Sequence, residues 1–559
     1  MKNSYDAIVV GSGISGGWAA KELTERGLTV LLLERGRMVE HRKDYTTEFK
    51  APWEMPFRGF NNPKMLQQDY AIQRRGTNFD EWSMPNFVKD ADHPYQTDAE
   101  APFQWRRGYQ LGGRSLTWGR QCYRWSDIDF GANQKDGYGI DWPVRYKDLK
   151  PWYDHVESFI GVNGTVEGLA QLPDGIFQPP MPLSAAEQLL ADSIATHYQD
   201  RKLIPGRSAN LTEAKPGRSP CQFRYICHRG CSFGAYFSTQ SSTLPAAQKT
   251  GRLTVLTDTI VDRIEYDSKS KRASAVHCID ANTGKRRSFS AKLFFLNASS
   301  FNSVGILLRS VSESFPQGLA NSSGTLGKYI MDHATTLSIS AELNQLQDRS
   351  YFGNRPSNFI IPRFRNVGAK ESSFLRGYSY QGVGFRANWK QAARGAGIGD
   401  ELKQNLTNQG KWRLLMVAFA ESLPVASNRV TLSDKTDKWG LRQFNIHLHH
   451  GENERKLLAD AATEAKNMLG QLDSKILASF SEPEHGGSAV HEMGGARMGY
   501  DSNTSVVNKW NQTHDVPNLF ITDGAAMSSS ANQNPSLTYM AFTARAAAYA
   551  AQKVKNGEL

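Results

Sequence analysis

The amino-acid sequence predicts an α/β fold in which a Rossmann-like dinucleotide-binding unit is combined with an antiparallel sheet. The first observation is the segment DAIVVGSGISGG (6–17), in which an apolar run leads into a G-x-G-x-x-G turn. The second is the run from FIIPRF (359–364) to NIHLHHG (445–451), where apolar and polar residues alternate as in an antiparallel sheet. A chain of 559 residues is long enough to contain both units.

The glycine-rich turn predicts a site for the phosphates of a dinucleotide. Gly11 permits a tight turn, Gly13 lets the backbone approach a pyrophosphate, and Gly16 lets the next helix pack on the strand. The second strand, 29–33, ends at Glu34, whose carboxylate can accept hydrogen bonds from a ribose. A glycine-rich turn in another kind of α/β protein is the alternative. The predicted binding residues of this unit are Gly11, Gly13, Ile14, Ser15, Gly16, Glu34 and Arg35.

Composition and charge exclude several classes of protein. No apolar run approaches the roughly 18 residues that span a bilayer, so the chain is expected to meet a membrane only through partners. The net charge is +11, but Lys and Arg are scattered, so nucleic-acid binding is not expected. The start, MKNSYDAIVVGSG, lacks the features of a leader, and we expect no export signal on this chain. Five cysteines make a poor disulfide framework for this length and favour reduced thiols or a metal site.

Three further segments have the character of cofactor-binding elements. GYQLGGRSLTWGRQ (108–121) is a second glycine-rich loop, and RLTVLTDTIVDRIEYD (252–267) predicts a strand, a bend and a strand. Near the carboxyl end, NLFITDG (518–524) predicts a strand that ends at Asp523 and Gly524, and a long alanine-rich helix is predicted to begin near Pro535.

In this order, the segments resemble the glucose-methanol-choline (GMC) family of flavin oxidoreductases. The resemblance spans nearly the whole chain and includes SGTLGKYIMDH (323–333). It implies that the dinucleotide is FAD, that residues 1–330 and 486–559 form a discontinuous FAD-binding domain, and that residues 331–485 form a substrate-binding domain. The further FAD-binding residues that it implies are Gly112, Gly113, Ser115, Thr117, Trp118, Val261, Asp523, Gly524 and Pro535.

The resemblance also implies a catalytic pair. His491 in SAVHEMGGARMG (488–499) occupies the position of the family's active-site histidine, and Asn534 in NQNPSLT (532–538) that of the second member, which is His or Asn. Hydride transfer from a carbinol to flavin requires a base that accepts the hydroxyl proton, and an imidazole suits this task near pH 7. The amide of Asn534 can hold the same oxygen. For a single histidine, a structural position in the core or on the surface is the alternative.

One position departs from part of the family. Members that bind FAD covalently carry a histidine just before the tryptophan of the second glycine-rich loop, and here Thr117 precedes Trp118. The resemblance therefore implies noncovalent FAD. The histidines His447, His449 and His450 alternate as in a strand and are expected at a sheet edge or on the substrate face. A metal site is the less favoured alternative, because no carboxylate or cysteine accompanies them at a familiar metal-binding spacing.

Three cysteines are concentrated in CQFRYICHRGCSFG (221–234). Cys221, Cys227 and Cys231 follow the spacing C-x5-C-x3-C and can converge on one iron-sulfur cluster. A zinc site with His228 as fourth ligand and a set of buried unpaired thiols are the alternatives. Attachment of a c-type haem is not expected, because its motif ends in Cys-His, whereas His228 follows the first cysteine of CHRGC.

The cysteine loop narrows the resemblance to the large subunits of bacterial multi-subunit sugar dehydrogenases. In some of these, three cysteines at this spacing hold a 3Fe-4S cluster that passes electrons to a cytochrome c. The resemblance implies a sugar or glucoside as substrate, a small subunit that bears the export signal, and a c-type cytochrome subunit. It also implies export to the periplasm with the partner, and a cytoplasmic location is the alternative.

The function expected from these residues is the FAD-dependent oxidation of a sugar carbinol, with C3 of a glucoside favoured by the resemblance. Glucose 1-dehydrogenase, gluconate 2-dehydrogenase and an oxygen-using pyranose oxidase are the alternative enzymes. A flavin-binding electron-transfer subunit without substrate chemistry is another class, but it would need neither His491 nor Asn534. The irregular segment 38–103 is expected to form a lid or a partner surface.

Overall fold

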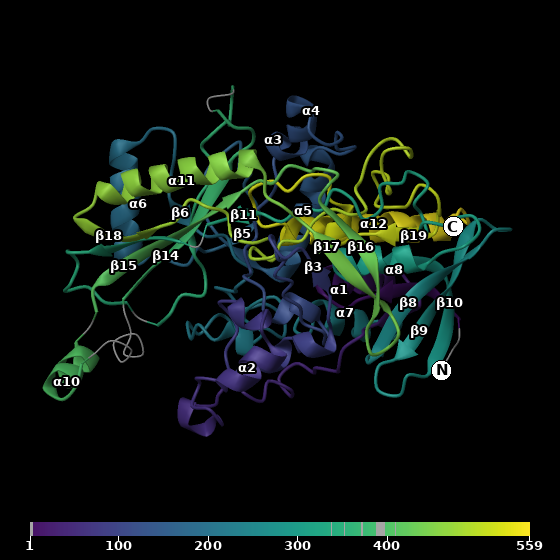
Figure 1. Ribbon diagram of the computed structural model, residues 1–559, viewed down its shortest axis with the longest axis horizontal. Coiled ribbons are helices and arrows are strands. Elements are labelled where there is room, and N and C mark those ends of the chain that lie inside the picture. Colours follow the sequence, from purple (N-terminus) through teal and green to yellow (C-terminus); the bar gives the residue numbers. More distant parts are fainter. Residues whose placement is uncertain (1–3, 337, 352, 370–372, 387–396, 409) are drawn as a thin grey trace.

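The computed structural model describes residues 4–336, 338–351, 353–369, 373–386, 397–408 and 410–559. Figure 1 shows two lobes along the longest axis. One contains a mainly parallel sheet beside α12 (Ser536–Lys555), and the other contains an antiparallel sheet beside α11 (Glu452–Gly470). The predicted combination of a Rossmann-like unit with an antiparallel sheet is therefore confirmed. The parts of the predicted run 359–451 at 370–372, 387–396 and 409 lie outside the described residues.

The nucleotide-binding lobe is built on a sheet with the order β7-β2-β1-β10-β9-β8, and β19 also pairs with β10. β1, β2, β7, β19 and the end of β10 are parallel, and they read as apolar runs because both faces are covered. α1 connects β1 to β2 and packs against α7 and α12. The elements are β1 (Ser4–Val10), α1 (Ile14–Glu25), β2 (Val30–Leu33), α7 (Thr243–Lys249), β7 (Leu253–Leu256), β8 (Thr259–Asp267), β9 (Arg272–Asp280), β10 (Arg286–Leu296) and β19 (Leu519–Ile521).

The antiparallel sheet has the order β18-β12-β15-β14-β13-β6, and β11 pairs with β15. Buried and partly buried residues alternate along β15, and α11 and α6 contact the strand. α6 and β6 precede residue 331 in the chain, so this sheet also draws on residues outside 331–485. The elements are α6 (Ala185–His197), β6 (Ile204–Pro205), β11 (Ala334–Thr335), β12 (Ile339–Leu343), β13 (Phe359–Ile361), β14 (Tyr378–Arg386), β15 (Trp412–Ala420) and β18 (Ser474–Ser479).

A third, three-stranded sheet joins distant parts of the chain. β16 (Arg429–Thr436) pairs antiparallel with β17 (Arg442–His447), and β17 pairs in parallel with β3 (Gln96–Thr97). The end of the alternating run, through His447, therefore belongs to this sheet rather than to the larger antiparallel one. β16 contacts α8 (Ser300–Arg309) of the nucleotide-binding lobe.

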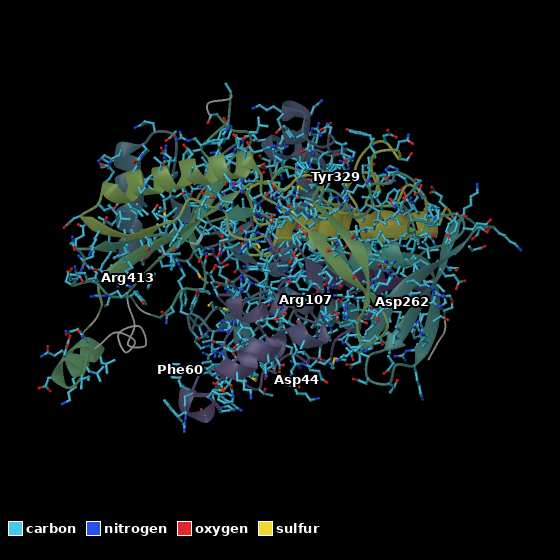
Figure 2. All side chains as sticks on the ribbon, viewed as in Figure 1. Asp44, Phe60, Arg107, Asp262, Tyr329 and Arg413 are labelled. Carbon is cyan, nitrogen blue, oxygen red and sulfur yellow. The ribbon has the colours of Figure 1, made fainter. Side chains whose placement is uncertain are left out.

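The segment 38–103 contains short helices and little regular structure. Several of its aromatic side chains, including Phe49, Trp53 and Phe60, are exposed, and Figure 2 shows Phe60 near the projecting end of the segment. Its helices are η1 (Pro52–Glu54), α2 (Pro63–Asp69), η2 (Gln73–Arg75), η3 (Met84–Asn86) and η4 (Asp90–Asp92). None of the described helices in the chain combines the length and the apolar composition needed to cross a bilayer.

Shorter elements complete the lobes and position the functional loops. These are η5 (Gly113–Leu116), α3 (Asp127–Phe130), α4 (Ala132–Asp136), α5 (Tyr146–Ile160), β4 (Val162–Asn163), β5 (Phe177–Gln178), η6 (Cys227–Arg229), α10 (Asp400–Thr407) and η7 (Gly524–Ala526). η5 lies within the second glycine-rich loop, η6 lies within the cysteine loop, and the two helices contact each other.

Candidate active site

The first glycine-rich turn leaves the amino terminus of α1 open to an anion. Gly13 is the N-cap residue, and no side chain caps the helix. A Cβ added at Gly13 would meet no atom within 4 Å, whereas a Cβ added at Gly16 would lie 1.8 Å from the carbonyl oxygen of Gly11. Gly16 is thus required by packing within the turn, and Gly13 leaves space in which a pyrophosphate can lie.

Hydrogen bonds join the two glycine-rich loops through Glu34. Glu34 Oε2 accepts a hydrogen bond from Ser12 Oγ (2.5 Å), and Ser12 Oγ accepts one from the Gly112 backbone N–H (2.8 Å). Glu34 Oε1 accepts a third from the Gly36 N–H (2.9 Å). Burial of this carboxylate at the end of β2 raises its pKa. The acidic residue predicted to contact a ribose therefore also fixes the spacing of the two loops.

The second glycine-rich loop lies directly against the first. A Cβ added at Gly113 would lie 3.4 Å from Gly13 Cα, so the two backbones approach closely. Trp118 anchors the loop, because its indole Nε1 donates a hydrogen bond to the Phe237 carbonyl (2.9 Å). Thr117 is buried and has no ring nitrogen that could bond to a flavin.

The other predicted nucleotide-binding residues surround these loops. Asp523 caps η7 and accepts a hydrogen bond from Ser303 Oγ (2.6 Å), and burial raises its pKa to about 6. Arg35 stacks on Tyr109, with its guanidinium carbon 4.1 Å from the ring centroid. The remaining positions are Ile14 and Ser15 in α1, Ser115 in η5, buried Val261 in β8, Gly524 in η7, and Pro535 before α12.

The structure brings His491 and Asn534 together. Asn534 Nδ2 lies 3.1 Å from His491 Nε2, and Asn534 Oδ1 accepts a hydrogen bond from Gln381 Nε2. Gln381 belongs to β14, so the antiparallel sheet supplies a support for the pair. His491 is partly exposed, whereas the Asn534 and Gln381 side chains are buried.

A second histidine fixes the orientation of the first. His333 Nε2 lies 2.9 Å from the Ala531 carbonyl oxygen, which can only accept, so this nitrogen carries a proton. In neutral His333, Nδ1 is then the acceptor for His491 Nδ1–H, at 2.9 Å. Neutral His491 is left with a lone pair on Nε2, the atom that faces Asn534. This arrangement can accept a proton from an alcohol.

Burial keeps both imidazoles neutral. It lowers the pKa of His333 to about 4, and burial together with His333 and Arg114 holds the pKa of His491 well below its ordinary value. The backbone of the catalytic loop is fixed as well, because the Asp332 carboxylate accepts the N–H groups of His491 (2.9 Å) and Gly487 (2.7 Å).

Sequence reasoning did not assign roles to His333, Asp332 or Gln381. The first two lie at the end of the quoted stretch SGTLGKYIMDH, where an adjacent Asp and His were the available signal. Gln381 lies inside a strand and carries no local signal, because its contact with Asn534 depends on the meeting of two segments 153 residues apart.

The three clustered cysteines lie apart from the catalytic pair and line one pocket. Cys221, Cys227 and Cys231 face this pocket together with Tyr236, whose hydroxyl donates a hydrogen bond to the Leu116 carbonyl (2.9 Å) in η5. Burial raises the pKa of Cys221 to about 11 and also raises that of Cys231. The other two cysteines, Cys122 and Cys278, are buried elsewhere.

The two glycine-rich loops and the oriented His491 define a class of protein: a nucleotide-dependent oxidoreductase that acts on an alcohol. Comparison with known proteins makes the class specific. The family models described as GMC oxidoreductase match residues 5–335 and 424–543. The chain belongs to the GMC oxidoreductase family, whose members bind FAD, and it is an FAD-dependent oxidoreductase that acts on CH–OH groups.

Individual relatives are distant but extend over the whole chain. A 2-methyl-1,2-propanediol dehydrogenase of Mycolicibacterium austroafricanum is 27% identical over 98% of this chain and 95% of its own. The fructose dehydrogenase large subunit of Gluconobacter japonicus is 26% identical over 99% of both chains. The crystal structure of pyridoxine 4-oxidase from Mesorbium loti shares the fold, with a TM-score of 0.58, 15% identity and coverage of 97% of this chain and 98% of that one.

The residues of the nucleotide-binding lobe fit FAD. The open space at Gly13 and the uncapped start of α1 suit its pyrophosphate, and the carboxylate of Glu34 suits a ribose. When bound, FAD supplies the acceptor for a hydride from the substrate carbon. The protein supplies the binding loops and a neutral imidazole of fixed tautomer.

Two glycine substitutions separate packing from cofactor binding. Gly13→Ala should leave the melting temperature of the FAD-free protein nearly unchanged, because its methyl group enters open space, but should weaken FAD binding. Gly16→Ala should lower the stability of the FAD-free protein itself, by about 1–3 kcal/mol, because its methyl group meets the Gly11 carbonyl. Thermal melts and FAD titrations of both variants check this, and equal loss of stability in the two would contradict it.

Proposed function

We propose that the protein is a sugar dehydrogenase that oxidises a ring carbinol and passes the electrons through an iron-sulfur cluster to a c-type cytochrome. The single observation that carries the relay is the pocket lined by Cys221, Cys227 and Cys231, which is linked by Tyr236 to the second glycine-rich loop. The whole-length similarity to a fructose dehydrogenase large subunit supports a sugar as substrate. Within this class, the sequence resemblance favours C3 of a glucoside, with glucose C1 and gluconate C2 as alternatives.

His491 acts in this proposal as the general base. Its Nε2 lone pair accepts the hydroxyl proton of the substrate while Asn534 Nδ2 donates a hydrogen bond to the same oxygen. Without substrate, the two groups satisfy each other at 3.1 Å. A substrate hydroxyl that enters between them replaces one hydrogen bond with two, and this orients the carbinol carbon.

The cysteine loop fits a cluster by its chemistry and its strain. Thiolates are the usual protein ligands of iron-sulfur clusters, and all three face one pocket. Phe223 and Tyr225, two bulky residues between the first two cysteines, adopt left-handed φ angles of 53° and 54°. A cluster held there would exchange electrons singly.

The contacts of the loop support a relay rather than a remote structural site. Beyond Cys231, Tyr236 donates a hydrogen bond to the Leu116 carbonyl, and the next carbonyl, of Phe237, accepts the indole N–H of Trp118. Leu116 and Trp118 both belong to the loop predicted to bind FAD. Tyr236 follows Cys231 by five residues, so the end of the cysteine loop is joined to the cofactor-binding loop by direct hydrogen bonds.

Zinc with His228 as a fourth ligand is less well supported. His228 Nε2 lies 3.0 Å from Asp80 Oδ2, so this nitrogen is engaged outside the thiol set. Four ligands around one zinc ion lie about 3.8 Å apart, given Zn–S bonds of about 2.3 Å in a tetrahedron. Among the described residues, the three thiols are not a group whose ligand atoms all lie within 4.8 Å of one another. Separated thiolates suit several iron atoms better than one zinc ion.

The relay requires partners. We propose a c-type cytochrome subunit as the electron acceptor and a small signal-bearing subunit that exports this chain to the periplasm; a cytoplasmic location and an oxygen-using oxidase are the competing possibilities. A flavin accepts two electrons at once and a haem accepts one, so a cluster between them separates the two transfers. The exposed aromatic residues of segment 38–103 border the cysteine loop, where Arg224 contacts Phe49, and offer a surface for a partner.

The substrate is identified by a direct assay. The purified enzyme is incubated with an artificial electron acceptor and with glucosides, glucose, gluconate, fructose and sugar alcohols, and the new carbonyl is located by NMR. A 3-keto-glucoside as main product supports the favoured substrate. A carbonyl at another carbon would show that the enzyme oxidises that position instead of C3. The absence of turnover with every sugar would contradict the proposal that the protein is a sugar dehydrogenase.

His491→Ala should bind FAD normally but slow its anaerobic reduction by sugar roughly 100-fold to 10,000-fold, because the proton acceptor is lost. Asn534→Ala should be less severe, because it removes positioning only. Stopped-flow absorbance measures both rates. A larger loss in Asn534→Ala than in His491→Ala would reverse the two roles.

His333 is predicted to act as a positioning residue for His491. His333→Leu should slow flavin reduction by about tenfold or more, as expected when the partner that orients a functional histidine is lost. His333→Asn retains an acceptor for His491 Nδ1–H and should restore part of the rate. In the wild type, the rate should stay level as the pH falls from 8 to 6, because the pKa of His333 is about 4 and that of His491 is well below its ordinary value. A leucine variant with an unchanged rate would contradict this role.

Acid precipitation should release yellow FAD into the supernatant, because Thr117 offers no ring nitrogen for a covalent bond to the flavin.

The native protein should contain iron and acid-labile sulfide if the three cysteines hold a cluster. Cys227→Ser should keep FAD reduction by sugar and reoxidation by small dyes, but should lose most cytochrome reduction. Cys122→Ser, at a buried cysteine far along the chain from the loop, is the matched control and should keep its iron. Unchanged cytochrome reduction in Cys227→Ser would reject the relay, and loss of FAD together with both activities would indicate a structural cluster.

A further inference from the structure

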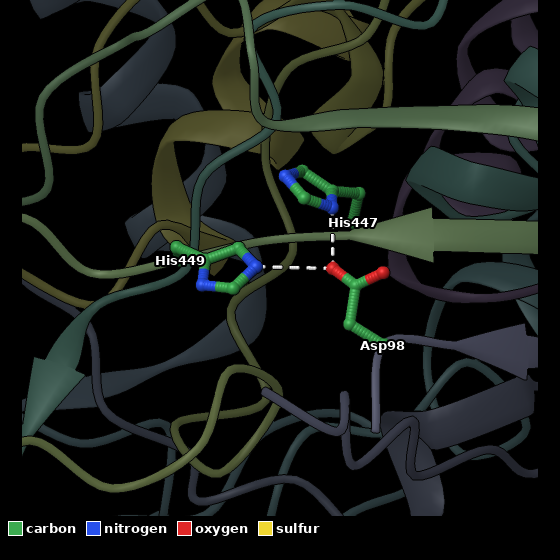
Figure 3. Close-up of side chains that lie close together, drawn as sticks. All are labelled: Asp98, His447 and His449. Carbon is green, nitrogen blue, oxygen red and sulfur yellow. Dashed lines mark hydrogen bonds and ion pairs between the residues drawn. The ribbon is translucent and has the colours of Figure 1, made fainter. Parts of the chain in front are cut away.

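Two histidines and an aspartate converge on the surface at a place remote from the cysteine loop in sequence. Figure 3 shows His447 and His449 directed at the carboxylate of Asp98. His447 Nδ1 and His449 Nε2 both contact the same oxygen, Oδ2, the latter at 3.0 Å. One ligand atom from each of the three residues lies within 4.8 Å of the other two. We propose that this triad binds a divalent transition-metal ion of the zinc type.

The sheet register produces the convergence. β17 and β3 pair in parallel, with Asn445 opposite Gln96 and Ile446 opposite Thr97, so the next positions are those of His447 and Asp98. His449 follows His447 by two residues, and in extended chain such residues project to the same side. The triad therefore follows from the strand pairing and does not require an unusual side-chain arrangement.

The backbone that carries the ligands is held in place before any ion binds. The N–H of His449 donates a hydrogen bond to Asn428 Oδ1 (3.0 Å), and its carbonyl accepts one from Asn428 Nδ2 (3.1 Å). His447 lies opposite Arg429 in the antiparallel pairing of β17 with β16. Fixed ligands lose little conformational freedom on binding, which favours affinity.

The donor set selects the kind of ion. Two imidazole nitrogens and one carboxylate oxygen suit zinc and neighbouring transition metals, whereas magnesium and calcium prefer sites made of oxygen ligands. The side chains of Asp98, His447 and His449 are 34%, 38% and 44% exposed, so water can complete the coordination. An ion bound here would join β3, which ends the long segment 38–103, to β17.

A single histidine–carboxylate pair in another part of the protein provides a comparison for the triad. His277 Nε2 lies 2.7 Å from Glu265 Oε2, and the other oxygen of this carboxylate, Oε1, accepts a hydrogen bond from Ser274 Oγ (3.2 Å). In the triad, two imidazole nitrogens contact the same carboxylate oxygen. A cation between the three groups would be bound by all three side chains at once. His277 therefore offers a matched control: a partly exposed histidine that is paired with a carboxylate and has no second histidine on that carboxylate.

Cobalt is the probe, because its spectrum reports its ligands. Co2+ should bind wild-type protein with weak visible bands typical of nitrogen and oxygen ligands, and this binding should weaken by at least about tenfold in Asp98→Asn, His447→Gln and His449→Gln. His277→Gln should bind like the wild type. Intense near-ultraviolet bands from thiolate ligands would instead report the cysteine loop and should disappear in Cys227→Ser.

Thermal melts provide a second readout. Zn2+ should raise the melting temperature of the wild type and of His277→Gln with increasing concentration, and should do so much less in the three triad variants. Equal cobalt affinity in wild-type and triad variants, binding that depends on Cys227 alone, or no binding at millimolar metal would each overturn the proposal.

Discussion

The catalytic centre depends on a row of hydrogen bonds that all point in one direction. At one end, the Ala531 carbonyl can only accept, and at the other the Gln381 amide donates to Asn534. Between them, neutral His333 and His491 each have one proton to give, so the fixed end determines which nitrogen of His491 remains a base. Reversing any member would leave two donors or two acceptors face to face, and a buried polar group without a partner is costly.

The fold is arranged to deliver the members of this row. Gln381 comes from the antiparallel sheet, and His333 follows the point where the chain leaves the nucleotide-binding lobe. Met331 and Met493 exchange backbone hydrogen bonds of 2.8 and 2.9 Å, which bring the segment of His333 beside the loop of His491. The base therefore forms only where the two lobes meet, as expected for a site that must hold a substrate against a cofactor bound to one lobe.

The parts that sequence could predict are those with local rules. The turn from Gly11 to Gly16 is readable because its glycines have separate steric tasks, and Gly16 indeed packs against the Gly11 carbonyl. His491 and Asn534 were reached through family resemblance, not from the residues alone. Gln381 and Asp98 could not be found from the sequence, because each meets its partner between segments more than 150 residues apart. Gln381 reaches Asn534 through the packing of the two lobes, and Asp98 reaches His449 through the pairing of β3 with β17. For that reason, the histidines at 447 and 449 seemed to lack a carboxylate.

The same desolvation that keeps the two imidazoles neutral also links catalysis to stability. Burial lowers the pKa of His333 in the folded protein to about 4, below its ordinary value of 6.5. The unfolded chain therefore binds more protons as the pH falls through 6.5, and the contribution of this histidine to folding is present above that pH and lost progressively below it. His491 shifts in the same direction. A neutral, oriented base and a folded lobe junction thus have one physical origin, and conditions that charge the pair weaken both.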